Sequence, residues 1–135
     1  MSVILDVRQA CEKRLAALSP SVLTFYEGTS GETEDALYQR CQFNILPPDD
    51  PVVGAGYYRE RIEFQVFVIS AYSEGAGAAY ERAELIRSSF YKSLTLTENT
   101  TKIHVLRTAS IGSVIPTTER LVVPVIIGLL AEVYS

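Results

Sequence analysis

Hydrophobic residues recur at spacings of three and four in two segments of the chain. In residues 3–18 these positions are Ile4, Val7, Cys11, Leu15 and Leu18. In residues 76–91 they are Ala76, Ala79, Ala83, Ile86 and Phe90. This spacing predicts two amphipathic helices, each with one buried face. The side of the second helix that faces outward is expected to carry Glu81, Arg82, Glu84 and Arg87.

In two segments between these helices, hydrophobic and polar residues alternate instead, which is the pattern of a strand with one buried side. In residues 37–46 one face holds Leu37, Cys41, Phe43 and Ile45. In residues 57–70 one face holds Tyr58, Ile62, Phe64, Val66 and Val68, and the other begins with Arg59, Arg61, Glu63 and Gln65. The prolines and glycines of residues 47–56 predict a long loop that joins the two segments as antiparallel neighbours.

Shorter strands are predicted around this pair. Residues 22–26 form one candidate, and residues 94–97 and 103–106 form a hairpin around a polar turn. Residues 27–35 and 110–118 are expected to be loops. The final strand is predicted over residues 121–134.

The predicted order is helix, three strands, helix, three strands within a single domain, residues 1–135. Helices separated by runs of antiparallel strands predict an α+β fold, a mostly antiparallel sheet with both helices packed on one face. The chain lacks the regular alternation of strand and helix that builds a doubly wound nucleotide-binding sheet.

The final predicted strand is apolar on both faces. One face carries Leu121, Val123, Val125, Ile127 and Leu129, and the other carries Val122, Pro124, Ile126, Gly128 and Leu130. Each of the two apolar faces of such a strand must be covered by other parts of the protein or by a partner. We expect the helices to cover one face and another subunit to meet the second. The alternative is that loops 27–35 and 47–56 fold over that second face.

Eight residues are predicted to form the subunit interface, because they lie on the second face or in the charged cluster of residues 59–63. They are Arg59, Arg61, Glu63, Phe67, Ile69, Val122, Ile126 and Leu130. An exposed charged strand face is the alternative interpretation of the cluster, since surface ion pairs contribute little.

Composition narrows the class of protein further. The chain is 47% hydrophobic and 21% charged, which excludes a disordered protein, and its net charge of -4 argues against specific binding of nucleic acid. Residues 1–5 lack the apolar core of a signal peptide, and the apolar run 121–131 is too short to span a membrane as a helix. A cytoplasmic site of folding, with Cys11 and Cys41 reduced, is therefore expected.

The sequence contains few candidates for catalytic residues. The fragments Gly54-Ala55-Gly56 and Gly75-Ala76-Gly77 lack the remaining residues of a phosphate-binding motif. His104 is the only histidine and has no ligand or general-base partner near it in sequence, so it is interpreted as a histidine on the solvent side of a strand. We predict no catalytic, cofactor-binding or metal-binding residue.

Four segments together resemble a known family. They are RLAALSPS, YYRERIEFQVFV, GAGAAYERAELIRSSF and IGSVIPTTERLVVPVIIG. In these segments and their order, along nearly the full chain, the sequence resembles the tail terminator-like proteins of long-tailed bacteriophages and prophages, also called tail completion or minor tail proteins.

The resemblance implies a structural role without catalytic or cofactor residues. Members of this family are small α+β subunits that form a ring, typically a hexamer. The ring caps the tail tube, ends its elongation and helps to join head and tail. The implied partners are further copies of the chain, the tail tube protein and a head-completion protein. The implied location is the head-proximal end of the virion tail, after synthesis in the bacterial cytoplasm.

A closed ring requires two different patches that meet head to tail. The doubly apolar last strand and the charged residues 59–63 are the candidates for these patches. The resemblance also suggests that acidic loop residues line a central channel and repel passing DNA, although a solvated loop explains them equally. These residues are Glu27, Glu32, Glu34 and Asp35.

Two other function classes stay open at this point. One is another oligomeric tail or neck subunit, or a non-viral interaction module with the same sandwich. Only a terminator is expected to bind tube ends and halt their growth, which separates the two. The other is a small enzyme, which would need a pocket that brings His104 together with remote carboxylates.

Overall fold

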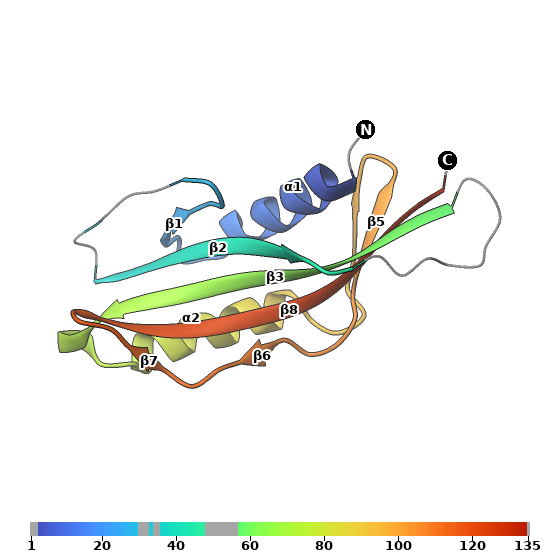
Figure 1. Ribbon diagram of the computed structural model, residues 1–135. Helices are drawn as coiled ribbons and strands as arrows, with labels where there is room; N and C mark the ends of the chain where they lie inside the picture. The colour runs from blue at the N-terminus through green and yellow to red at the C-terminus, as the bar shows by residue number, and fades with distance from the viewer. Residues whose placement is uncertain (1–2, 30–32, 34–35, 48–56, 135) are drawn as a thin grey trace.

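The computed structural model describes residues 3–29, 33, 36–47 and 57–134. Within them the chain forms two α-helices, one short 3-10 helix and eight strands (Figure 1). The helices are α1 (Val3–Ala16), η1 (Tyr72–Glu74) and α2 (Gly77–Ser89). The strands are β1 (Leu23–Phe25), β2 (Leu37–Ile45), β3 (Tyr57–Ala71), β4 (Thr95–Glu98), β5 (Thr101–Val105), β6 (Ser110–Ile111), β7 (Ile115–Pro116) and β8 (Arg120–Tyr134).

One sheet contains all of these strands, in the order β1-β2-β3-β8-β5-β4, with β6 and β7 also paired to β8. At its centre β3 and β8 are antiparallel along their full 15 residues, from Tyr57↔Tyr134 to Ala71↔Arg120. The predicted pairing of β2 with β3 and the predicted β4–β5 hairpin are confirmed. The mostly antiparallel α+β fold is therefore as expected.

The segment 110–118 differs from the prediction. It was expected to be a loop, but β6 and β7 pair with β8 at Ser110↔Ile126 and Ile115↔Val122. Strands of two residues are too short to show an alternating pattern, so backbone pairing alone defines them. Between them Gly112 N donates to the Pro124 carbonyl at 2.9 Å, and an added Cβ would lie 2.7 Å from Pro124 Cγ.

The core lies between the two helices and one face of the sheet. Strand positions of one parity are fully or almost fully buried there: Ile62, Phe64, Val66 and Val68 on β3, and Val123, Val125, Ile127 and Leu129 on β8. From α1 the core receives Val7, Cys11 and Leu15, and from α2 it receives Ala79, Ala83 and Ile86. In Figure 1, β3 and β8 pass in front of α2. Both helices thus cover one face, as predicted, and we call the opposite face the helix-free face.

Arg82 of α2 is buried, with 5% of its surface exposed, so its predicted outward position is wrong. Its Nε donates to Gln39 Oε1 at 3.1 Å and its Nη1 donates to the Pro20 carbonyl at 2.6 Å. Gln39 Nε2 in turn donates to Thr24 Oγ1 at 2.9 Å. Burial lowers the pKa of the Arg82 guanidinium. These bonds connect α2 to β1, β2 and the turn after α1.

Asp6 is a second buried charged residue, placed near the start of α1. Its two carboxylate oxygens accept from Asn99 Nδ2 at 2.7 Å and from Thr101 Oγ1 at 2.6 Å. Hydrogen bonds to a charged acceptor are among the stronger ones in proteins. Asp6 therefore fixes the β4–β5 hairpin against α1.

Of the helices that the structure describes, none combines the length and the apolar character needed to cross a membrane.

Candidate functional site

The helix-free face collects all eight residues that were predicted to form a subunit interface. The β3–β8 register places Ile69 opposite Val122, Phe67 opposite Pro124, and Arg61 opposite Leu130. All eight side chains share the parity opposite to the buried core positions, since successive residues of a strand point to opposite faces. They are Arg59, Arg61, Glu63, Phe67 and Ile69 on β3, and Val122, Ile126 and Leu130 on β8.

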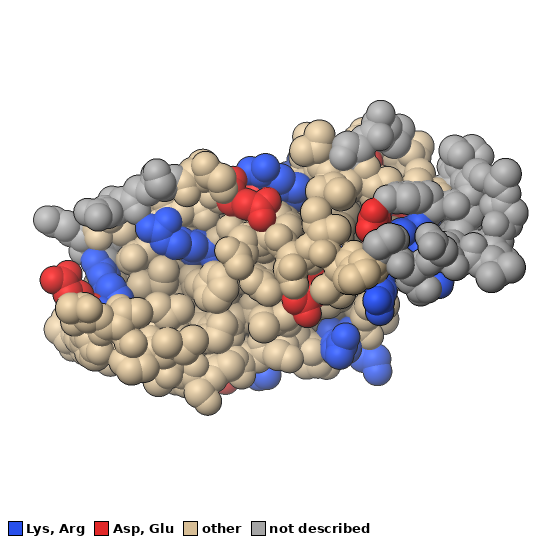
Figure 2. Space-filling model, viewed as in Figure 1, with Lys and Arg blue, Asp and Glu red and all other residues tan. Residues whose placement is uncertain are grey.

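The middle of this face is apolar and partly open. Phe67, Val122 and Pro124 are half-buried, and Ile126 has 36% of its surface exposed. Ile69 is buried within the chain itself, at 6%, so it offers little surface to a partner. Figure 2 shows this region as a broad area without charged side chains, with charges around it. No helix of the described residues covers it.

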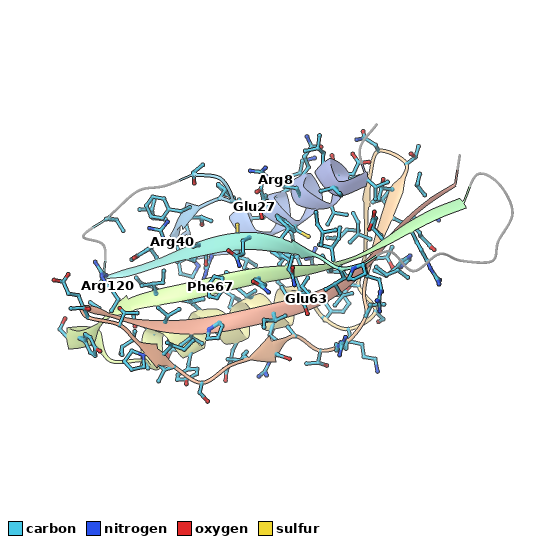
Figure 3. All side chains as sticks on the ribbon, viewed as in Figure 1. Arg8, Glu27, Arg40, Glu63, Phe67 and Arg120 are labelled. Atoms are coloured by element: carbon cyan, nitrogen blue, oxygen red, sulfur yellow. The ribbon has the colours of Figure 1, made fainter. Side chains whose placement is uncertain are left out.

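Two arginines lie near one end of the apolar area (Figure 3). The Arg40 guanidinium carbon is 4.6 Å from the Phe25 ring centre, and that of Arg120 is 5.2 Å from the Tyr38 ring centre. Arg120 Nη2 also donates to the Thr33 carbonyl at 2.9 Å. Arg40 and Tyr38 were not among the predicted interface residues, although the alternation of β2 places both on the side opposite Cys41.

Glu63 lies at the other end of the apolar area, in a polar cluster (Figure 3). Its Oε1 accepts from Asn44 Nδ2 at 3.1 Å and from Gln65 Nε2 at 3.4 Å. A hollow of about 190 Å³ lies beside it, and Arg107 and Ile126 also line this hollow. Arg107 passes over Gly128, since a Cβ added there would be 3.5 Å from Arg107 Nε. Arg107 is a residue of this face that the strand pattern could not reveal, because it follows β5 in a loop.

His104 has partners that are remote in sequence. Its Nε2 is 2.9 Å from Glu132 Oε1, and its Nδ1 is 3.1 Å from Thr95 Oγ1. Both ring nitrogens are therefore engaged, and the side chain is half-buried rather than fully on the solvent side. Among the described residues, no group of three or more His, Cys, Asp or Glu side chains is arranged to hold a metal ion.

Both cysteines are buried free thiols. Burial, followed by the charge of Glu12, raises the pKa of Cys41 to about 12. Burial also raises the pKa of Cys11, and the neighbouring Cys41 adds to this effect. Because the thiolate is the nucleophilic form, these thiols are inert at neutral pH.

Of the four acidic residues proposed to line a channel, the structure describes Glu27. Its Oε2 accepts from the backbone N–H of Phe43 at 2.9 Å, and its carbonyl accepts from Arg8 Nη2 at 2.8 Å. Glu27 thus bridges β2 and α1 and is half-buried. Glu32, Glu34 and Asp35 lie outside the described residues.

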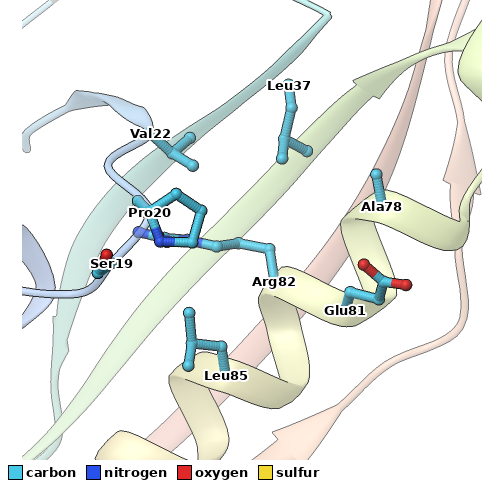
Figure 4. A pocket seen from close by; sticks show the side chains of 8 residues that line it. All are labelled: Ser19, Pro20, Val22, Leu37, Ala78, Glu81, Arg82 and Leu85. Carbon is cyan, nitrogen blue, oxygen red and sulfur yellow. The ribbon is translucent and has the colours of Figure 1, made fainter.

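A pocket of about 360 Å³ opens on the helix side of the molecule, between α2, the start of β2 and the turn after α1 (Figure 4). Its lining is mostly apolar and comprises Ser19, Pro20, Val22, Leu37, Ala78, Glu81, Arg82 and Leu85. Because these residues come from separate segments of the chain, no local sequence pattern could have predicted the pocket.

Comparisons with known proteins connect this fold to a family. A family model described as "Phage tail terminator protein" matches residues 6–128. No curated protein sequence matches the chain. One similar solved structure has a TM-score of 0.78 and 23% sequence identity, and the match covers 100% of this chain and 99% of the other. At this identity the structural similarity shows the fold alone.

Proposed function

Since the chain belongs to the phage tail terminator protein family, we propose that it forms a ring that caps the phage tail tube. The family is one of structural proteins, and the chain is accordingly a phage tail protein. In the proposed role the ring, with six subunits, ends tube elongation and helps to join the tail to the head. Its partners are further copies of itself, the tail tube protein and a head-completion protein.

The observation that supports assembly is the open, apolar part of the helix-free face. Phe67, Pro124 and Ile126 are in contact with solvent although the chain has two helices that cover the opposite face. Exposed apolar areas surrounded by polar groups are typical of protein–protein contacts. A ring uses such a patch once in every subunit, against a different patch of its neighbour.

Capping follows from assembly at the end of a tube. A ring seated there occupies the surface to which the next tube subunit would add, so elongation stops. Its free side faces the head, which makes the head-proximal end of the tail the proposed location. The proposed lining of the channel by Glu27, Glu32, Glu34 and Asp35 belongs to the same arrangement, because negative charge would repel DNA that passes through.

The direct test is the growth of tail tubes in vitro. Tail tube protein from the same phage is polymerised with and without this chain, and tube lengths are measured by electron microscopy. We expect shorter tubes with extra density at one end, and longer tubes when the chain is added late. The heat-denatured chain is the control. Tubes of unchanged length with bare ends would refute the capping role, and density along the tube walls would favour a different tail subunit.

A further inference from the structure

The outer side of α2 carries two acidic residues beside an apolar pocket. Glu81 and Glu84 are both exposed, and among the described residues neither is part of an ion pair. Glu81 also lines the pocket of about 360 Å³, together with the apolar Ala78 and Leu85 (Figure 4). We call this the α2 surface: two glutamates, one turn of helix apart, next to an opening that can accept an apolar side chain.

The helix-free face offers the complementary pattern. Arg61 and Arg107 are exposed there, and within the described part of the chain neither is in an ion pair. The exposed Ile126 lines the same hollow as Arg107, and Phe67 and Pro124 continue the apolar area beyond it. Glu63 shares the hollow, but its carboxylate already accepts from Asn44 and Gln65.

The two charged residues lie close together on each surface. Residues three apart on a helix have Cβ atoms about 5–6 Å apart, which applies to Glu81 and Glu84. Arg61 lies opposite Leu130, and Arg107 crosses Gly128, two residues earlier on β8. Arg61 on β3 and Gly128 on β8 are diagonal neighbours of adjacent strands, a relation that separates two positions by about 7–8 Å. Because arginine and glutamate side chains are long, two ion pairs can form between surfaces with these spacings.

We propose that the helix-free face of one copy binds the α2 surface of the next copy. Arg61 and Arg107 face Glu81 and Glu84 of the neighbour, and the apolar area around Ile126 covers the rim of the neighbour's pocket. The two surfaces lie on opposite sides of one molecule, because α2 packs on the other face of the sheet. Because the two surfaces differ, the contact is head to tail, which is the type of contact that builds a ring when the rotation between neighbours closes. This inference rests on the proposed ring and names the surfaces that build it.

A second copy is the occupant because the chain itself carries both halves of the contact. DNA would meet Glu63 and Glu132 on the helix-free face as well as a net charge of -4. An acidic surface of the tube protein would leave the neighbouring α2 surface without a partner. These alternatives are outcomes of the experiment below.

Charge reversal tests the pairing. The mass in solution is measured by light scattering over a concentration series at low salt. The wild type is expected at a multiple of 14.9 kDa. The double variants Glu81→Arg/Glu84→Arg and Arg61→Glu/Arg107→Glu are expected at 14.9 kDa. The variant with all four changes is expected to regain the mass of the wild type. Glu119→Arg and Lys92→Glu, which are exposed elsewhere, serve as controls that keep the wild-type mass.

Each other result overturns the inference. A double variant that keeps the wild-type mass shows that these charges are outside the interface. A fourfold variant that stays monomeric shows that the charges do not face each other. A wild type that is monomeric at every concentration shows that the two surfaces do not bind by themselves. Circular dichroism verifies that each variant is folded, and tube lengths, measured separately, decide whether the capping role itself fails.

Discussion

Arg82 shows at the scale of a single residue how a charge can act as part of the core. Its guanidinium donates to Gln39 and to the Pro20 carbonyl, so Arg82→Met would leave the buried Gln39 oxygen and the partly buried Pro20 carbonyl without these donors. We expect this change to lower the free energy of unfolding by about 1–3 kcal/mol, measured by urea denaturation. The exposed Ser88→Ala of the same helix, as control, should stay within about 0.5 kcal/mol of the wild type. Equal stabilities of the two variants would contradict the structural role of Arg82.

Asp6 makes a comparable prediction for the β4–β5 hairpin. Asp6→Ala removes the acceptor for both Asn99 and Thr101, which hold the hairpin against α1. Because hydrogen bonds to a charged group are stronger than neutral ones, we expect a loss of about 2–3 kcal/mol. Gln9→Ala, on the exposed side of the same helix, is the control. Faster amide hydrogen exchange in residues 95–105 of the Asp6 variant would locate the effect, and unchanged exchange there would contradict it.

The two buried thiols are expected to lower the stability of the folded chain at alkaline pH. Burial raises the pKa of Cys41 from 9.0 to about 12 in the folded chain, and it raises that of Cys11 in the same direction. The unfolded chain loses these protons at lower pH, so the contribution of the thiols to stability is fully present below about pH 9 and is lost as the pH rises further. In mass spectrometry after iodoacetamide at pH 8.5, we expect no adduct on the native chain and two in urea. Rapid labelling of the native chain would refute the assigned burial.

At the scale of elements, Gly112 controls how β6 and β7 attach to β8. An alanine there would place Cβ 2.7 Å from Pro124 Cγ, whereas a Cβ at Gly77 meets nothing within 4 Å. Overpacking of this kind costs about 1–3 kcal/mol, so Gly112→Ala should be destabilising by that amount. Gly77→Ala at the start of α2 should be neutral or slightly stabilising. Thermal unfolding of both variants checks the contrast, which would be absent if the 110–118 segment were loosely attached.

Individual strands also show what the sequence pattern can and cannot predict. The alternation of β3 correctly separates Phe64 and Val66 from Arg61 and Glu63, because burial of one face fixes the periodicity of a long strand. The pairing of β6 and β7 has no such signal. The burial of Gln39 and Arg82 was likewise not predictable, since each is polar and only their contact in the fold satisfies both.

At the scale of the molecule, neighbouring residues on β8 separate assembly from folding. Ile127 is fully buried in the core, and Ile126 is on the helix-free face. Ile127→Asp should prevent folding, because an unpaired charge in the core is costly. Ile126→Asp should give a folded chain with a mass of 14.9 kDa in light scattering, without the proposed oligomer. A normally assembled Ile126→Asp variant would exclude this face from the interface.

The candidate interface was only partly accessible from the sequence. The doubly apolar β8 indicated a second covered face, and the eight predicted residues do lie on one side of the sheet. Arg107 and the pocket beside Glu81 depend on how loops and helices pack, so they required the three-dimensional structure. Whether a neighbouring subunit contacts these residues stays a prediction for the charge-reversal experiment.

The pairing of β3 with β8 also determines when the protein can fold. The two central strands are separated in the chain by α2 and by β4 to β7, so their ladder closes a long loop. Chains dominated by such distant pairings typically fold in milliseconds to seconds. During synthesis β3 emerges well before β8 and waits with one edge unpaired. The β3–β8 ladder of this sheet therefore forms late, once β8 has left the ribosome.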